Sequence, residues 1–279
     1  MAETPATRAY RLAYDGRPFH GFQRQPDVLT VEGCVFGALR DLDVLEEGAD
    51  KPEGYAAAGR TDAGVSARAQ TLAFEAPEWL SPRALNSELP ASVRAWASAD
   101  VDSSFHATHD ADSRTYRYHL YAPRDEGARA VDEGLIRDAF DRLAGEHDFH
   151  NLTPDDEGTV RDLSAAVERD GDFLVVELEA GGFARQLVRR VVGLAVEIGR
   201  GESEVEKVDR VLGEGVVEGP EGVAPAAPYP LVLWDVAYPG VEFSVDEDAV
   251  ASVREVFSDR CVEFSTRGWV AGAIRDSIE

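Results

Sequence analysis

SRTYRYHLY, residues 113–121, is the stretch that decides the fold, because its side chains alternate with the period of two that a β-strand requires. Arg114, Tyr116, Tyr118 and Leu120 share one face of this predicted strand. The chain before it and the chain after it both interleave strand and helix patterns. The strand therefore opens the second of two α/β units.

Both units begin with a strand followed by a helix and end on a strand. In the first unit we predict strands at 8–14, 70–74 and 92–101 and helices at 30–42 and 81–89. In the second we predict strands at 113–121, 165–168, 173–179 and 231–237 and helices at 132–144, 183–198 and 204–212. This interleaving predicts an α+β fold of two ferredoxin-like or RRM-like halves with a catalytic cleft between them. The halves are residues 1–104 and 105–243, and residues 244–279 form an acidic helical extension.

The chain is strongly acidic. It contains 53 Asp and Glu residues against 28 Lys and Arg residues, a formal net charge of −25. Only Lys51 and Lys207 are lysines. Salt at about 1 M shortens the screening length to about 3 Å and so removes the self-repulsion of such a surface. The composition therefore indicates adaptation to high salt, and taken alone it argues against a nucleic-acid partner.

The sequence also bears on location and cysteine chemistry. No stretch approaches the roughly 18–20 consecutive apolar residues of a membrane-spanning helix. Residues 1–5 lack the basic and apolar regions of a signal peptide, so we expect a soluble cytoplasmic protein. Cys34 and Cys261 lie far apart without a Cys or His at ligand spacing, which favours buried thiols over a disulfide or a zinc knuckle.

Several kinds of catalytic site are absent from the sequence. Neither lysine follows a glycine as a P-loop requires, and neither a GxGxxG nor a GxSxG segment occurs. The closest histidine spacings are His106 with His109 and His147 with His150. These pairs could bind a metal only with a carboxylate partner, so we expect no metal site.

GRTDAGV, residues 59–65, places a charged triplet between glycines that permit a tight loop at a strand end. Arg60 and Asp62 are two residues apart, so in an extended stretch they project to the same side. Arg60 could then hold Asp62 ionised by direct pairing, as a nucleophile or proton acceptor requires. The alternative is an Asp that forms an Asx-turn with its own backbone.

The slightly longer segment AGRTDAGV, residues 58–65, resembles the signature loop of the TruA family of tRNA pseudouridine synthases. Four more blocks resemble that family and occur in the family's order: YDGRPFHGFQRQ (14–25), LNSELP (85–90), FHATHDADSRTYRYHLY (105–121) and FARQLVRRVVG (183–193). The resemblance covers about residues 8–240. Its motifs are specific enough to carry individual residues over.

The resemblance implies that Asp62 is catalytic, that Tyr116 packs on the target uracil, and that Arg60 and Arg189 are supporting cations. An arginine such as Arg189 on a mostly buried helix needs a counter-charge, and Asp62 is a natural one. Further RNA contacts are predicted from four residues in these blocks or beside them: Arg24, His106, Arg114 and Arg190. A local basic cleft on an acidic body is also expected, because seven arginines cluster in the same motif segments: Arg17, Arg24, Arg60, Arg68, Arg117, Arg185 and Arg190.

The resemblance implies an isomerase that converts uridine to pseudouridine in the anticodon stem-loop of tRNA, at positions 38, 39 and 40, without a cofactor or metal. It also implies a homodimer with tRNA spanning both subunits. Two rivals are a non-catalytic RRM-like RNA-binding protein, which needs no carboxylate in its cleft, and a glycosidase, which needs a second acid near Asp62. Ser66 departs from the family, in which many members have histidine there. The extension 244–279 has no family role to carry over.

The composition leads to a test of salt dependence. We expect little activity in dilute buffer, rising into molar KCl, because screening permits the acidic chain to fold and to dimerise. The measurement is circular dichroism together with pseudouridine formation from about 0.1 to 3 M KCl, over which the screening length falls from about 10 Å to below 3 Å. An enzyme that is folded and fully active at about 0.1 M KCl and is inhibited steadily by added salt would contradict adaptation to high salt. The chain would then be an ordinary acidic protein.

Overall fold

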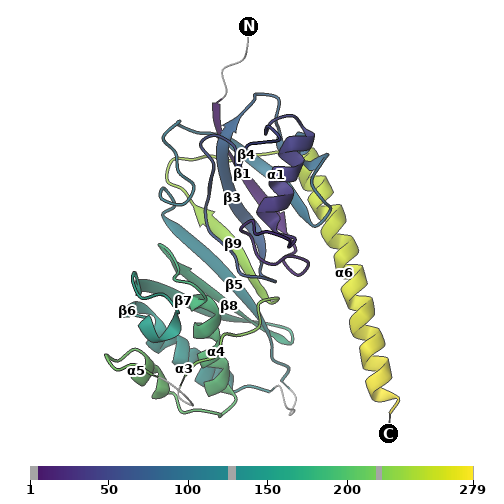
Figure 1. Ribbon diagram of the computed structural model, residues 1–279. Helices are drawn as coiled ribbons and strands as arrows, with labels where there is room; N and C mark the ends of the chain where they lie inside the picture. The colour runs from purple at the N-terminus through teal and green to yellow at the C-terminus, as the bar shows by residue number, and fades with distance from the viewer. Residues whose placement is uncertain (1–5, 125–129, 218–221, 279) are drawn as a thin grey trace.

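The computed structural model describes residues 6–124, 130–217 and 222–278 (Figure 1). Residues 1–5, in which no signal peptide was expected, lie outside these ranges, as does part of the segment 213–230, which its glycines and prolines predict to be a loop. Within them a ten-stranded mixed sheet runs in the order β10-β4-β1-β3-β9-β5-β8-β7-β6, with β2 paired to β3. The predicted α+β class is therefore confirmed.

The bounds of the elements are as follows. The strands are β1 Ala6–Tyr14, β2 Ala56–Ala57, β3 Ser66–Ala76, β4 Val93–Asp100, β5 Ser113–Tyr121, β6 Gly145–Asp148, β7 Val160–Asp170, β8 Phe173–Ala180, β9 Leu231–Ala237 and β10 Ser244–Val245. The helices are α1 Val31–Asp41, α2 Pro82–Asn86, α3 Glu133–Leu143, α4 Leu187–Gly199, α5 Lys207–Val211 and α6 Glu247–Asp276, with a 3-10 turn at His150–Leu152.

In the first unit the strands lie side by side as β4-β1-β3-β2, and every neighbouring pair is antiparallel. The helix α1 begins where the sequence predicts, because the Thr30 hydroxyl accepts a hydrogen bond from the Gly33 amide at 3.2 Å. The apolar side of α1, with Val35 and Leu39, packs on β1 and β3 in one core cluster. This core fixes the sheet face from which the loop at 59–65 emerges.

In the second unit the order is β9-β5-β8-β7, again antiparallel throughout. Tyr118 and Leu120 on β5 face α3 and α4 and are buried with them in a second core cluster. The alternation predicted for residues 113–121 is thus present, with Arg117 and His119 on the less buried face. Burial of one face of β5 fixes the register that presents Tyr116 beside α4.

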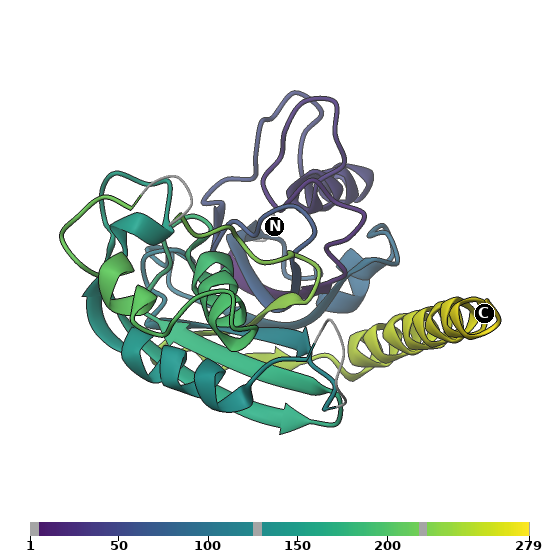
Figure 2. The same cartoon turned by 90° about the horizontal axis from the view of Figure 1, so that it is seen from below.

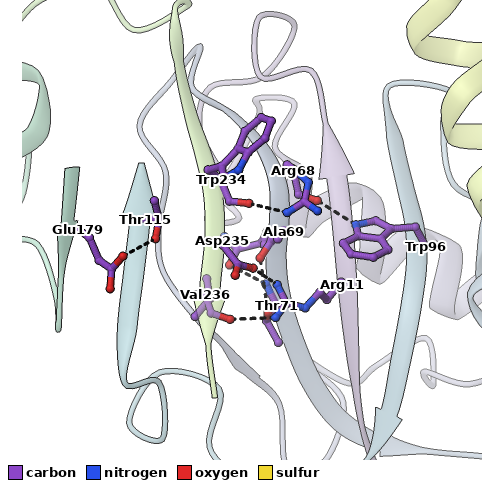
Figure 3. A network of polar contacts seen from close by, with 11 residues as sticks. Arg11, Arg68, Ala69, Thr71, Trp96, Thr115, Glu179, Trp234, Asp235 and Val236 are labelled. Carbon is purple, nitrogen blue, oxygen red and sulfur yellow. Dashed lines mark hydrogen bonds and ion pairs between the residues drawn. The ribbon is translucent and has the colours of Figure 1, made fainter. Parts of the chain in front are cut away.

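The two units join where β3 runs parallel to β9 over two residue pairs, Ser66 with Val232 and Ala67 with Leu233. Beyond this short pairing a side chain from β1, the strand next to β3, reaches β9. Arg11 on β1 pairs with Asp235 and donates a hydrogen bond to the Val236 carbonyl at 2.9 Å (Figure 3). The Arg11 side chain is only 10% exposed. Because a buried guanidinium requires such partners, Arg11 holds the seam of the sheet closed.

The predicted helix at 183–198 begins later than expected, at Leu187. Gln186 has a left-handed φ of 60°, which interrupts the helical path. Before it, the Thr153 hydroxyl donates to the Arg185 carbonyl at 3.0 Å and holds the chain as a loop. The prediction was wrong here because apolar periodicity does not register a tertiary contact of this kind. The expectation of buried thiols was also wrong for Cys261, which is exposed.

The extension is helical over Glu247–Asp276, as predicted, after the two-residue strand β10 at Ser244–Val245. Its helix α6 begins at an N-cap, Asp246, whose carboxylate accepts from the Ala249 amide at 3.0 Å. Figures 1 and 2 show α6 leaving the edge of the sheet beside β4 and projecting past the body. Within the described ranges, no helix combines the length and the apolarity of a membrane span. The boundaries at 104 and 243 remain predictions.

Removing the Arg11 side chain tests the seam. Arg11→Ala should lower the free energy of unfolding by about 2–3 kcal/mol, because hydrogen bonds to charged groups are lost and the Val236 carbonyl is left unpaired. Denaturant unfolding in molar KCl measures this. The control is Arg83→Ala, whose exposed ion pair with Asp248 should contribute less than about 1 kcal/mol. Equal losses in the two variants would contradict the role given to Arg11.

Candidate active site

A large open cleft lies over the seam between the units. Its volume is about 1310 Å³, larger than the roughly 300–1,000 Å³ of a small-molecule pocket. The residues that line it include Asp62 from the loop before β3, Tyr116 from β5, Arg189 from α4 and Leu231 from β9. The cleft is therefore built from both units.

The loop that carries Asp62 is anchored from below by buried polar groups. The Tyr14 hydroxyl and the Thr61 hydroxyl lie 2.7 Å apart in a hydrogen bond. The side-chain amide of Gln70 donates to the Gly59 carbonyl at 2.8 Å. Tyr14 and Gln70 are fully buried, and burial raises the pKa of Tyr14 above its usual range. These anchors hold Gly59 and Thr61, the residues on either side of Arg60, and so fix the chain that leads into Asp62.

The Asp62 carboxylate pairs with Arg189, whose Nη1 donates to Oδ2 at 3.0 Å. The Nε of Arg189 donates to the Ala226 carbonyl at 2.8 Å, which fixes the plane of the guanidinium. The counter-charge expected for Arg189 is thus present. Among the described residues, the hydrogen-bond partner of the Asp62 side chain is Arg189 and not its own backbone, so the Asx-turn alternative does not hold.

The ion pair expected between Arg60 and Asp62 is not found among the described residues. Arg60 is exposed at the wall of the cleft. The two-residue spacing applies to extended chain, whereas Asp62 begins a turn that closes with the Val65 amide donating to the Asp62 carbonyl at 3.1 Å. The turn directs Asp62 toward Arg189 on α4, and Arg60 remains exposed.

Tyr116 lines the cleft beside Asp62. Its ring meets the ring of Phe183 edge-on, with centroids 5.2 Å apart. Burial, with the nearby Asp62 charge adding to it, raises the pKa of Tyr116 to about 12. The hydroxyl is therefore protonated at neutral pH, and the ring is held at a fixed angle by Phe183.

Two residues of the predicted RNA-binding set, Arg114 and His106, line the cleft. The Arg114 guanidinium donates to the carbonyls of Ala58, Thr108 and Gly181. It thus clamps the chain just before the loop at 59–65. The His106 ring stacks on His109 with centroids 4.2 Å apart, and His106 lines the cleft. Their contacts with RNA remain predictions.

The two remaining predicted RNA contacts, Arg24 and Arg190, differ in their position relative to the cleft. Arg24 lines the cleft, where it pairs with Asp50. Arg190 points instead to the Val223 carbonyl, to which it donates at 2.7 Å, and is not among the residues lining the cleft. Arg189 and Arg190 are adjacent on α4, so their side chains leave the helix about 100° apart and only one faces the cleft.

The sign of the charge in the cleft is opposite to that of the chain. Among the described residues, seven Arg and Lys side chains and four Asp and Glu side chains line it, although the chain carries −25. Lys51, one of the two lysines, is among them. A basic cleft on an acidic body is therefore present, but of the seven arginines expected to form it, all of which the structure describes, only Arg24, Arg60 and Arg185 line it.

Three functional contacts were not identified from the sequence. Phe183 was noted only as the start of a helix, whereas it supports Tyr116. Tyr14 and Gln70 anchor the loop, and Gln70 carried a signal, because a polar residue in an apolar strand requires a buried hydrogen-bond partner. No group of three or more His, Cys, Asp or Glu side chains in the described ranges is arranged to hold a metal ion.

Comparison with known proteins gives one consistent family. Residues 139–239 match the family model described as tRNA pseudouridine synthase. The tRNA pseudouridine synthase A of Haloarcula marismortui is 58% identical over 97% of this chain and 100% of its own length. Proteins of the same name from Natronomonas pharaonis and Archaeoglobus fulgidus are 58% and 38% identical over 96% and 92% of this chain, and 98% and 93% of their own lengths. The chain belongs to the tRNA pseudouridine synthase A family.

Proposed function

We propose that this chain is an isomerase that converts uridine to pseudouridine in the anticodon stem-loop of tRNA, at positions 38, 39 and 40, with Asp62 as its catalytic carboxylate. The observation that carries the proposal is the Asp62–Arg189 pair at 3.0 Å beside the Tyr116 ring, in an open cleft in which cationic side chains outnumber acidic ones. A glycosidase would need a second carboxylate about 5–9.5 Å away in place of this arginine. An RNA-binding module would need no buried support for a carboxylate.

The reaction replaces the bond between the ribose and the first nitrogen of uracil with a bond between the ribose and the fifth carbon of uracil. The carboxylate attacks the anomeric carbon of the ribose or accepts a ribose proton, and the bond from that carbon to the first nitrogen of uracil breaks. The uracil rotates while it stays in the cleft, and its fifth carbon bonds to the anomeric carbon as the carboxylate leaves that carbon or the ribose proton is returned. The fifth carbon then loses its proton. The nitrogen takes up a proton, so atoms and electrons balance. No electron or group passes to another molecule, and we therefore propose that no cofactor takes part.

The cleft residues divide these tasks between them. The target base must leave its stack to reach Asp62, and an aromatic ring such as Tyr116 offers a new stacking surface. Phe183 holds that ring on edge, so the flipped base meets a fixed plane. Arg60, Arg185 and Lys51 lie exposed on the walls, where phosphates of the flanking nucleotides would lie. Arg189 orients the carboxylate.

We also propose that the two units are ferredoxin-like halves. What supports this is that the first unit runs β-α-β-β-α-β, as β1-α1-β2-β3-α2-β4, and that the second has the same order, β5-α3-β7-β8-α4-β9, with β6, the 3-10 turn and α5 as additions. Their strand orders, β4-β1-β3-β2 and β9-β5-β8-β7, correspond position by position. A homodimer with tRNA spanning both subunits, and a cytoplasmic location, are further parts of the proposal.

Replacing the carboxylate tests the catalytic assignment. Asp62→Asn should abolish pseudouridine formation and leave tRNA affinity within about a few-fold, because it removes the reacting group and preserves its shape. Turnover and tRNA binding are measured on the same preparation in molar KCl. The matched control is Asp50→Asn, an exposed carboxylate of the same cleft, which should retain most of its turnover. Wild-type turnover in Asp62→Asn would end the assignment.

Two substitutions at Tyr116 separate its ring from its hydroxyl. Tyr116→Phe keeps the ring against Phe183, so kcat should stay within about three-fold of wild type. Tyr116→Ala removes the stacking surface, which by alanine substitution contributes about 1–3 kcal/mol per base, and should lower kcat/KM by about 10-fold to 100-fold. Single-turnover assays on tRNA measure both. Equal losses of kcat/KM in Tyr116→Phe and Tyr116→Ala would assign the function to the hydroxyl instead of the ring.

A further inference from the structure

The extension helix α6 lies along the first unit through a series of side-chain contacts. Arg94 on β4 donates to the Ser252 hydroxyl at 3.1 Å near the start of the helix. Two turns further on, Arg260 and Phe264 reach the segment 15–17 that follows β1. Beyond these residues the helix is exposed, with 81% of Trp269 accessible. Contact with the body therefore reaches as far as the segment 15–17.

Arg17 is held from two sides in that segment. Its guanidinium lies over the Phe264 ring, 3.5 Å from the centroid. It also donates two hydrogen bonds to the Asp15 carboxylate, both at 2.8 Å, and Arg260 lies 4.0 Å from the same carboxylate. Burial would raise the pKa of Asp15, but the hydrogen bonds from Arg17 outweigh burial and hold that pKa below its usual value. The segment is thus fixed to α6.

The same segment touches the loop that carries Asp62. The Gly16 amide donates to the Ser66 hydroxyl at 3.0 Å. A Cβ atom at Gly16 would lie 2.0 Å from the Val65 carbonyl oxygen, so the two backbones are in direct contact. The Val65 amide in turn donates to the Asp62 carbonyl at 3.1 Å. A displacement of Gly16 is therefore transmitted to the turn that presents the Asp62 carboxylate.

We propose that Phe264 and Arg260 are positioning residues for catalysis, which hold Asp62 in place against Arg189 through Arg17, Gly16 and Ser66. This inference rests on the proposed function. It gives the extension a role in the reaction although the helix lies outside the cleft. It also gives Ser66 a task, because its hydroxyl joins the catalytic loop to the braced segment.

The first experiment compares two substitutions on one helix. Phe264→Ala should lower kcat for pseudouridine formation by about 10-fold with KM within about two-fold, because a small misplacement of a reacting group lowers the rate without weakening tRNA binding. Phe264→Tyr keeps the ring over Arg17 and should restore kcat. Trp269→Ala, on the exposed end of α6, should behave as wild type. Wild-type kcat in Phe264→Ala would overturn the proposal.

A double-mutant cycle tests whether the effect passes through Arg17. Because Phe264 and Arg17 act through one contact, the variant carrying Phe264→Ala and Arg17→Ala should lose no more kcat than the worse single variant. A loss equal to the product of the two single losses would overturn the proposal. If Phe264→Ala does not fold, Arg260→Gln, which removes only a charge, serves in the same cycle with a smaller loss.

Hydrogen exchange separates this inference from the proposed function. The Gly64 and Val65 amides, bonded to the Phe19 and Asp62 carbonyls, report directly on the turn at 62–65. Both should exchange at least about three-fold faster in Phe264→Ala and at the wild-type rate in Trp269→Ala. This readout needs no activity, so a wild-type protein without pseudouridine formation would refute the proposed function alone. Unchanged exchange in Phe264→Ala would refute the brace.

Discussion

The hydrogen bond from Arg189 to Asp62 is the constraint on which the site depends, because its two partners belong to different units. Asp62 precedes β3 in the first unit, and Arg189 lies on α4 in the second. A contact of 3.0 Å across that boundary requires the units to keep one fixed relation. The short β3–β9 pairing and the Arg11 bridge supply it on the sheet. The cleft is therefore a property of the joined sheet and not of either unit alone.

The charge of the chain is distributed to serve two opposing needs. The chain as a whole is strongly acidic, whereas in the cleft cationic side chains, nearly all of them arginines, outnumber acidic ones. Arginine is suited to this setting because its planar guanidinium binds phosphate in bidentate geometry and stacks on aromatic rings, and both interactions depend less on long-range attraction than a lysine point charge does. Curated relatives at 57–58% identity come from Haloarcula, Natronomonas and Halobacterium, which are halophilic archaea. The composition and the relatives thus agree.

The sequence predicted the elements whose signals are local. The strands at 113–121 and 231–237 have the bounds that the sequence predicts. The helix capped by Thr30 begins and ends within one residue of its predicted bounds, 30–42. Strands of two to four residues, such as β2 and β6, were missed because they are too short to show a period. The late start of α4 was missed because Gln186 takes its left-handed conformation from tertiary contacts.

The candidate site was predicted in its residues and less well in its contacts. The motif blocks predicted Asp62, Tyr116 and Arg189 as residues of one site, and in the structure all three line one cleft. Sequence spacing favoured Arg60 as the ion-pair partner of Asp62, but the turn that begins at Asp62 directs its carboxylate to Arg189 instead. Contacts between residues far apart in the chain, such as Arg11 with Asp235 or Arg17 with Phe264, have no sequence signal. They depend on how the sheet and α6 pack.

The central claim is that this chain forms pseudouridine in the anticodon stem-loop of tRNA. The most direct measurement is a map of pseudouridines in the tRNA of cells that carry the chain, of cells from which it is deleted, and of deleted cells to which it is restored. The account predicts that pseudouridine at positions 38, 39 and 40 disappears on deletion and returns on restoration, with other positions unchanged. An identical map in all three would contradict it.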